Sequence, residues 1–144
     1  MVLSRADIAG LIPHAGAMCL LEEVISSDSD GIVCRAVSHR DAMHPLREGG
    51  ILHAVCGIEY AAQAMAVHGA LTSGAGASAQ PKRGMLAAAR DVVLSVDRLD
   101  DIAEDLVVSA RRLVAEGEWL LYEFSLHGGG RELVRGRATV SLAG

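Results

Sequence analysis

The chain has 144 residues and a formal net charge of −5, and 51% of its residues are hydrophobic although only 3% are aromatic. This length suits one domain, which we place at residues 1–144, with an aliphatic core that is poor in large side chains and compatible with an oligomer. The negative charge disfavours nucleic acid as a partner, and the chain lacks the polybasic signature of a membrane-surface protein.

The cysteines and the N-terminus favour a cytoplasmic protein. Cys19, Cys34 and Cys56 are odd in number and lack Cys-x-x-Cys spacing. Arg5 and Asp7 interrupt the N-terminus before an apolar region of signal-peptide length can form. We therefore expect three buried free thiols, no disulfide framework, and a reducing cytoplasmic environment.

Hydrophobic patterning predicts an α+β domain. The expected elements are a short helical turn, two strands, a long helix and four strands, at residues 6–11, 18–26, 31–38, 51–68, 84–97, 105–115, 118–127 and 131–142. Glycine breaks near Gly117 and at Gly128–Gly130 fit hairpins between the last three strands. The last strand alternates apolar residues with Arg135 and Arg137, so we expect one buried and one solvated face. A sheet that buries an apolar helix on one face would curl around it.

The expected long helix carries one charged side chain. Glu59 is the only Asp, Glu, Lys or Arg between Gly49 and Pro81, in a run that is apolar almost all the way round. Such a helix is expected in a protein interior. A buried carboxylate needs a specific partner or a raised pKa. Glu59 therefore either has such a partner or is placed to transfer a proton. The polar residues inside the run, His53 and Gln63 among them, argue against a membrane span.

Two segments carry motifs. Residues 11–24 read LIPHAGAMCLLEEV, and residues 57–64 read GIEYAAQA. The first resembles the opening motif (L/I)-P-H-R-x-P-(M/F)-x-L-(L/V)-(D/E)-x-V, and the second the helix signature x-(I/L)-E-x-(M/L)-A-Q-x, of the 3-hydroxyacyl-acyl-carrier-protein dehydratase family of hotdog proteins. The likeness is greatest to the aryl-polyene branch of that family, where His68 also has a counterpart.

The resemblance implies a fold, a reaction and partners. The expected fold is a single hotdog domain, an antiparallel sheet wrapped around a central apolar helix. The expected reaction is dehydration of a 3-hydroxyacyl thioester, held on an acyl carrier protein, to the enoyl thioester in fatty-acid- or polyene-type synthesis. The resemblance further implies a homodimer or a hotdog heterodimer, with the acyl chain at the interface and no cofactor.

The resemblance also assigns site residues, with two departures, one of which is that the family's proline six residues before the acid is His53 here. Glu59 takes the place of the catalytic acid, and a histidine nearby would remove the α-proton. The housekeeping enzymes carry a Gly-His-Phe-Pro loop whose histidine lies fourteen residues before the acid, but that position is Pro45 here, with His44 one residue earlier. The aryl-polyene branch lacks this loop too, so we expect either His14 or His44 to be the base.

Three further residues are candidates for substrate binding. His53 lies near the expected helix start, where backbone N–H groups would stabilise a thioester oxygen that gains charge. Gly50 would allow a close approach of substrate and backbone. Gln63, one turn after Glu59, would orient its carboxyl group or bond to the backbone. Each candidate also has a structural alternative, and for His68 a hydrogen-bonded position in the core is favoured.

Other chemistries find less support. The histidines and cysteines lack metal-ligand spacing, so no metal site is expected. There is no P-loop and no Gly-x-Ser-x-Gly nucleophile motif. Two rivals to dehydration stay open. The chain could be a non-catalytic, acyl-binding subunit of a hotdog dehydratase complex, or a hydrolase of acyl thioesters in which the helix acid activates water.

Overall fold

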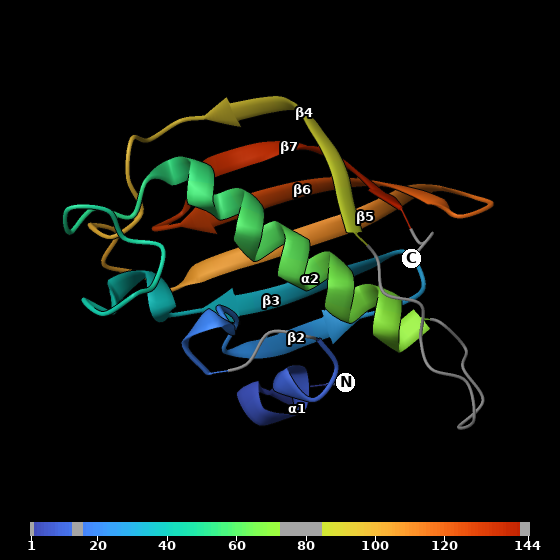
Figure 1. The fold of residues 1–144 in the computed structure, drawn as a ribbon, viewed down its shortest axis with the longest axis horizontal. Coiled ribbons are helices and arrows are strands. Elements are labelled where there is room, and N and C mark those ends of the chain that lie inside the picture. The colour runs from blue at the N-terminus through green and yellow to red at the C-terminus, as the bar shows by residue number, and fades with distance from the viewer. Residues whose placement is uncertain (1, 13–15, 73–84, 142–144) are drawn as a thin grey trace.

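A curved antiparallel sheet wraps around one long helix (Figure 1), as the sequence predicts. The computed structural model describes residues 2–12, 16–72 and 85–141. Seven strands follow the order β1-β2-β3-β5-β6-β7-β4, and every pairing is antiparallel. The strands are β1 (Leu3–Ser4), β2 (Glu23–Ser27), β3 (Gly31–Ala36), β4 (Met85–Leu94), β5 (Leu106–Glu116), β6 (Trp119–Gly128) and β7 (Arg131–Ser141). The α-helices are α1 (Arg5–Ala9) and α2 (Gly57–Thr72), and the 3-10 turns are η1 (Gly16–Met18), η2 (Ser38–Arg40) and η3 (Ala54–Cys56).

The long helix begins later than expected. The sequence pattern places its start near Ile51, but α2 begins at Gly57 after the single turn η3. Gly49 and Gly50 have φ values of 58° and 82°, so they form a tight turn in which the backbones of Glu48 and Ile51 bond to each other. This turn diverts the chain, because the left-handed region excludes those two residues from a helix. The first expected strand is also shorter, since the chain before Glu23 forms η1 and an extended segment.

Glycines shape the rest of the fold at two kinds of position. Gly129 and Gly130, with φ values of 62° and 76°, close the β6–β7 hairpin that the sequence predicts. Gly57 has a different reason, because a Cβ there would lie 3.2 Å from Leu126 Cδ2 and from Val134 Cγ2. The start of α2 therefore packs directly onto β6 and β7.

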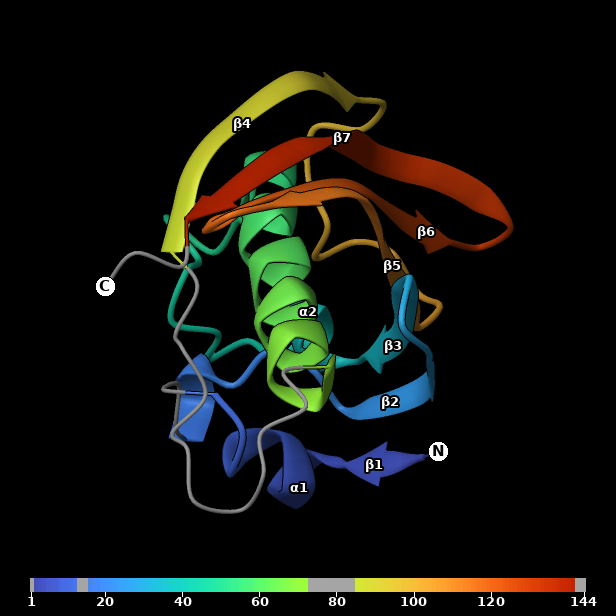
Figure 2. The same cartoon turned by 90° about the vertical axis from the view of Figure 1, so that its right-hand side faces the viewer.

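The core fills the space between α2 and the concave side of the sheet (Figure 2). It is aliphatic and rich in alanine, as expected, with Tyr60, Tyr122 and Phe124 as its largest side chains. In β7, Val134 and Ala138 are buried while Arg135 and Arg137 are exposed, so the predicted alternation is confirmed.

The three thiols are free, and two of them are buried. Burial raises the pKa of the Cys34 thiol to about 12. Cys56 is half-buried rather than buried, because it lies on the single turn that precedes α2.

Two surfaces of the described chain are exposed or half-exposed. Strand β4 forms one edge of the sheet, and nine of its ten residues are exposed, including Met85, Val93 and Leu94. On α2 and the turn before it, a strip containing Val55, Glu59, Ala62 and Ala66 faces away from the sheet and is exposed or half-exposed. We call these the β4 surface and the α2 strip.

Candidate functional site

The candidate site lies at the N-terminal end of α2, where the predicted acid sits. Glu59 is in the first turn of the helix. Its carboxylate raises the pKa of the Cys56 thiol, one turn earlier, after the larger effect of burial on that thiol, so the two side chains are neighbours. The described residues give Glu59 no hydrogen bond or ion pair, which leaves its carboxyl group available to a substrate.

The expectation that Glu59 is buried is wrong for the single chain. Glu59 is exposed, because it lies on the α2 strip rather than on the face packed against the sheet. The helix is apolar on all sides, but the described chain leaves the α2 strip exposed or half-exposed. Burial does not desolvate this carboxyl group in the described chain.

The predicted base His44 is buried and bonded on both ring nitrogens. Leu46 N–H donates to His44 Nδ1 at 3.0 Å, so the ring hydrogen resides on Nε2 and the ring is neutral. Nε2 lies 3.0 Å from the Tyr60 hydroxyl group and donates to it. Tyr60 in turn donates to Ser38 Oγ at 2.7 Å, and Ser38 donates to the Leu20 carbonyl at 2.8 Å. Each group in this chain of hydrogen bonds therefore has a fixed donor or acceptor role, and both ring nitrogens of His44 are occupied.

Burial is the main cause that lowers the pKa of His44, and the Arg47 charge adds to it. Burial also raises the pKa of Tyr60 to about 12. Both groups therefore stay neutral over the physiological range. The His44–Tyr60–Ser38 chain ties the loop before the site to α2 at the residue next to Glu59.

Two other buried histidines are also hydrogen-bonded, His68 on both ring nitrogens and His39 on one. His68 Nε2 donates to the Asp28 carbonyl at 2.8 Å, and Nδ1 accepts from the Tyr122 hydroxyl group at 2.6 Å, so its expected place in the core is confirmed. His39 Nε2 lies 3.0 Å and 2.9 Å from the carbonyls of Ile102 and Glu104, while its Nδ1 has no partner among the described residues. Burial is the largest cause that lowers the pKa of both rings. We call His39, His44 and His68 the core histidines.

The predicted residue Gln63 is a structural contact, and His14 lies outside the described residues. Gln63 is buried, and its amide accepts from Leu20 N–H at 2.9 Å and donates to the Met18 carbonyl at 2.6 Å. Of the two roles expected for Gln63, the structure shows the bond to the backbone. The amide holds the segment before β2 against α2.

His53 and Gly50 lie close to the helix start. His53 is exposed at the N-cap of η3, and no hydrogen bond of its side chain is found in the described chain. Gly50 is at the tip of the turn, where a Cβ would meet nothing within 4 Å. Conformation, rather than a close contact, thus explains this glycine in the single chain.

A charged cluster that no sequence motif predicts stabilises this end of the helix. The Asp100 side chain is only 7% exposed, accepts from Leu52 N–H at 2.9 Å, and pairs with the guanidinium group of Arg98. Arg47 Nη1 lies 4.0 Å from Asp100 Oδ2 and donates to the Gly50 carbonyl at 2.9 Å. The hydrogen bond from Arg98 is the largest cause that lowers the pKa of Asp100 to about 2. Nothing in the run 97–101 distinguishes Asp100 from its acidic neighbours, since the partner amide lies 48 residues away.

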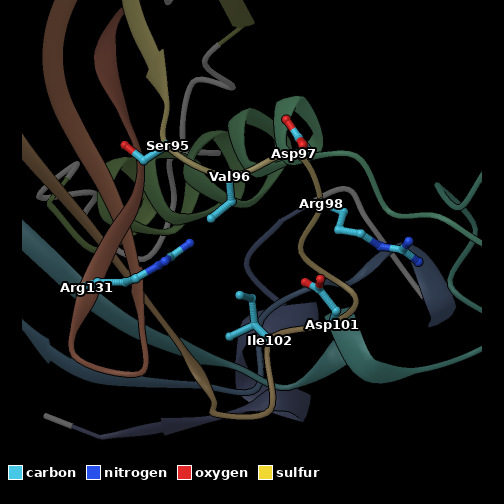
Figure 3. Close-up of a pocket in the computed structure, with 7 residues that line it drawn as sticks. All are labelled: Ser95, Val96, Asp97, Arg98, Asp101, Ile102 and Arg131. Carbon is cyan, nitrogen blue, oxygen red and sulfur yellow. The ribbon is translucent and has the colours of Figure 1, made fainter.

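A shallow polar depression lies beside this cluster (Figure 3). Its lining residues come from the β4–β5 connection and the start of β7, and they are Ser95, Val96, Asp97, Arg98, Asp101, Ile102 and Arg131. Acidic and basic side chains balance there, which gives no preference for an anion or a cation. Among the described residues, no group of three or more His, Cys, Asp or Glu side chains is arranged to hold a metal ion. None of the helices in the described ranges is both long and apolar enough to span a membrane.

The chain is similar to known proteins in sequence and in structure. A family model described as ApeP-like, ApeP dehydratase, matches residues 6–143. Among solved structures, the dehydratase heterocomplex ApeI:P from Xenorhabdus doucetiae matches with a TM-score of 0.81 and 26% identity, over 93% of this chain and 89% of that one. A search of curated proteins finds no match to this sequence.

More distant structures share the fold. Zebrafish thioesterase superfamily member 2 matches with a TM-score of 0.65 and 16% identity, over 96% of this chain and 95% of that one. The PaaI protein of E. coli matches with a TM-score of 0.64 and 14% identity, over 95% of this chain and 88% of that one. Together with the sheet and helix described above, these similarities confirm the predicted hotdog fold.

Proposed function

The chain belongs to the ApeP-like dehydratase family, whose model spans residues 6–143, and from this premise we propose that it dehydrates a 3-hydroxyacyl thioester to the enoyl thioester. The substrate we propose is carried on an acyl carrier protein, in fatty-acid- or polyene-type synthesis. The observation that carries this proposal is the position of Glu59, an unpaired carboxyl group on the uncovered side of the helix that bears the family's acid. The free thiols are in keeping with a cytoplasmic compartment.

Glu59 would act as the acid of an elimination. A base removes the α-proton of the thioester. The electron pair of the broken Cα–H bond forms the new carbon–carbon double bond as the C3–O bond breaks. The hydroxyl group leaves as water by taking the proton of Glu59. The enolate character that builds up on the thioester oxygen would be stabilised by N–H groups at the start of α2, near His53 and Gly57. The reaction eliminates water without net oxidation or reduction, so it needs no redox cofactor.

We assign the base to His14 rather than to His44. Both ring nitrogens of His44 are engaged, and its hydrogen-bond chain would have to be broken before it could accept a proton from a substrate. His14 belongs to the other motif that resembles the dehydratases. His53, exposed at the helix start, is the substrate-binding residue that we keep beside Glu59, whereas Gln63 and Gly50 hold the backbone around them.

We further propose that the working unit is a hotdog oligomer. The β4 surface and the α2 strip expose apolar side chains such as Met85 (64%) and Val55 (52%). Apolar side chains that gather on an exposed edge strand or helix face often mark an interface. A second chain over the strip would also remove water from Glu59 and so favour the protonated acid. The solved relative in Xenorhabdus is a heterocomplex, which supports a hotdog heterodimer as an alternative to a homodimer.

A second candidate function is a non-catalytic subunit of such a complex. The observation that favours it concerns the core histidines: His44 and His68 are hydrogen-bonded on both ring nitrogens, and His39, whose Nδ1 has no partner among the described residues, is fully buried. Copurification with a second hotdog chain, together with no turnover by this chain alone, would support this role. Turnover by the isolated chain would exclude it.

The test replaces the acid and keeps the fold. Glu59→Gln should lower the turnover of a carrier-bound 3-hydroxyacyl thioester by about 10²–10⁴-fold, the usual contribution of a general acid. Glu48→Gln, which changes an exposed carboxyl group on the turn before the helix, is the matched control and should leave turnover unchanged. Mass spectrometry of the carrier-bound product distinguishes loss of one water from hydrolysis, which would release the free acid. Undiminished dehydration by the Glu59→Gln protein would refute the assignment.

A further inference from the structure

We propose that Asp100 is a positioning residue for the site, which holds the chain from Gly50 to Gly57 in place and thereby fixes the first turn of α2 that presents Glu59. This inference rests on the proposed function, because it assigns a role within the same site. It concerns a residue that is remote in sequence from both motifs and that has no direct access to a substrate.

The contacts of Asp100 converge on the segment before the helix. Its Oδ1 accepts from Leu52 N–H at 2.9 Å. The next backbone bonds continue this attachment, since Leu99 N–H donates to the Leu52 carbonyl at 2.8 Å and Ala54 N–H donates to the Asp97 carbonyl at 3.0 Å. One side-chain and two backbone hydrogen bonds therefore attach the segment from Leu52 to Ala54 to the β4–β5 connection.

Two arginines flank Asp100, and we call Asp100, Arg47 and Arg98 the clamp. Arg98 donates to Asp100 from Nε at 3.1 Å and also from Nη2. Arg47 lies 4.0 Å away and is only 15% exposed, so it depends on Asp100 for a neutralising charge. Arg47 in turn donates to the carbonyls of Gly50 and His39 at 2.9 Å and 3.1 Å. Asp100 thus orders the Gly49–Gly50 turn through Arg47 as well as the chain after it.

The clamp is coupled to Glu59 by a short and regular stretch of backbone. After Ala54 the chain forms one 3-10 turn and enters α2 at Gly57, which packs directly against β6 and β7. Glu59 is the third residue of the helix, so no flexible loop separates it from the clamp. A displacement of about 1 Å at a reacting group can cost about 10²-fold in rate, so loosening the segment would be felt at the acid.

The charge of Asp100 matters as much as its shape. An asparagine could still accept from Leu52 N–H, but it would leave two guanidinium groups without their shared carboxylate. Repulsion between Arg47 and Arg98 would then act on the turn and on the helix start. Replacing Asp100 by asparagine therefore distinguishes the effect of the charged cluster from that of the hydrogen bond to Leu52 N–H alone.

The experiment compares Asp100→Asn with Asp101→Asn, which removes the same charge from the exposed neighbour. Each protein is tested for kcat and KM in dehydration of a 3-hydroxyacyl thioester and for amide hydrogen exchange across residues 47–60. For Asp100→Asn we expect kcat to fall at least tenfold with KM changed less than threefold, because the acid would be misplaced in the transition state. Exchange should be faster at Leu52 and Ala54, and the second half of α2 should stay protected. The Asp101→Asn protein should match the wild type in both readouts.

The outcomes separate this inference from the proposed function. If kcat stays within twofold of the wild type in a folded Asp100→Asn protein, the positioning role is refuted even where exchange is faster. If Asp100→Asn does not fold, Arg98→Gln replaces it, since that guanidinium is 40% exposed and its loss keeps the bond to Leu52. If the wild type dehydrates no 3-hydroxyacyl thioester, the proposed function fails, and unchanged exchange at Leu52 and Ala54 would independently overturn the clamp.

Discussion

The His44–Tyr60–Ser38 chain makes a quantitative prediction about stability. Tyr60→Phe removes the hydroxyl group that accepts from His44 Nε2–H and donates to Ser38 Oγ. The ring cannot move its hydrogen to Nδ1, because that atom already accepts from Leu46 N–H. A buried donor is therefore left without a partner, which costs about 1–3 kcal/mol. We expect the free energy of unfolding to fall by about that amount.

A double-mutant cycle tests whether these bonds act together. Ser38→Ala leaves the Tyr60 hydroxyl group and the Leu20 carbonyl without their common partner, so it should also be destabilising. The hydrogen bond between the two side chains is lost in each single variant but only once in the double variant. We therefore expect the double variant to be destabilised by about 0.5–3 kcal/mol less than the sum of the two single variants. Urea unfolding followed by circular dichroism measures all four proteins at neutral pH. Ser125→Ala, on the outer face of β6, is the control and should change stability by less than about 0.5 kcal/mol.

Two results would refute the reasoning. Additivity of the two substitutions within about 0.3 kcal/mol would mean that the hydroxyl groups are not coupled. A Tyr60→Phe protein as stable as the wild type would mean that His44 is not held as a neutral donor. In that case His44 would return as a candidate for the base.

Three further predictions follow from the core and its polar contacts. Burial lowers the pKa of the three core histidines, so the unfolded chain binds more protons than the folded one below about pH 6.5. Stability should therefore fall as the pH decreases through 6.5, by up to about 1.4 kcal/mol per pH unit for each histidine, and equal denaturation midpoints at pH 7.5 and 5.5 would contradict this. Gln63→Leu should cost about 1–3 kcal/mol, since it leaves Leu20 N–H unpaired, and exchange at that amide should rise; continued protection there would argue against the contact. Gly136→Ala should destabilise by about 1–3 kcal/mol, because a Cβ would lie 2.9 Å from Phe124 Cζ and 3.0 Å from Val92 Cγ2, and a thermal melt that does not shift would show that the core yields.

The features that the sequence predicted are those written in local patterns. The alternation along β7 is visible in consecutive residues, and so are the glycines that close the hairpins. The start of α2 was misplaced because an apolar residue such as Ile51 fits a helix and an extended bridge equally well. The φ values imposed at Gly49 and Gly50 decide between the two, and that requirement is not visible in hydropathy.

The site was harder to predict because its contacts join distant parts of the chain. Asp100 meets Leu52 across 48 residues, and Gln63 meets Leu20 across 43. No spacing rule links such pairs, so Gln63 could be assigned equally to a substrate or to the backbone. His44 was chosen by its distance in sequence from Glu59, a criterion that does not register the Tyr60 hydroxyl group beside it.

The exposure of Glu59 links assembly to the proposed chemistry. A helix that is apolar on every side predicts complete burial, but hydropathy does not distinguish cover by the same chain from cover by another. In the single chain the α2 strip is exposed or half-exposed and nine of the ten β4 residues are exposed, so under the proposed oligomer a second chain would complete the burial. A second chain in that position would also remove solvent from the carboxyl group of Glu59. Desolvation raises the pKa of a carboxyl group, which lets it keep its proton near neutral pH. Under the proposed function, association would therefore create the acid as well as the binding site, and an isolated chain would hold Glu59 in place without making it a proton donor.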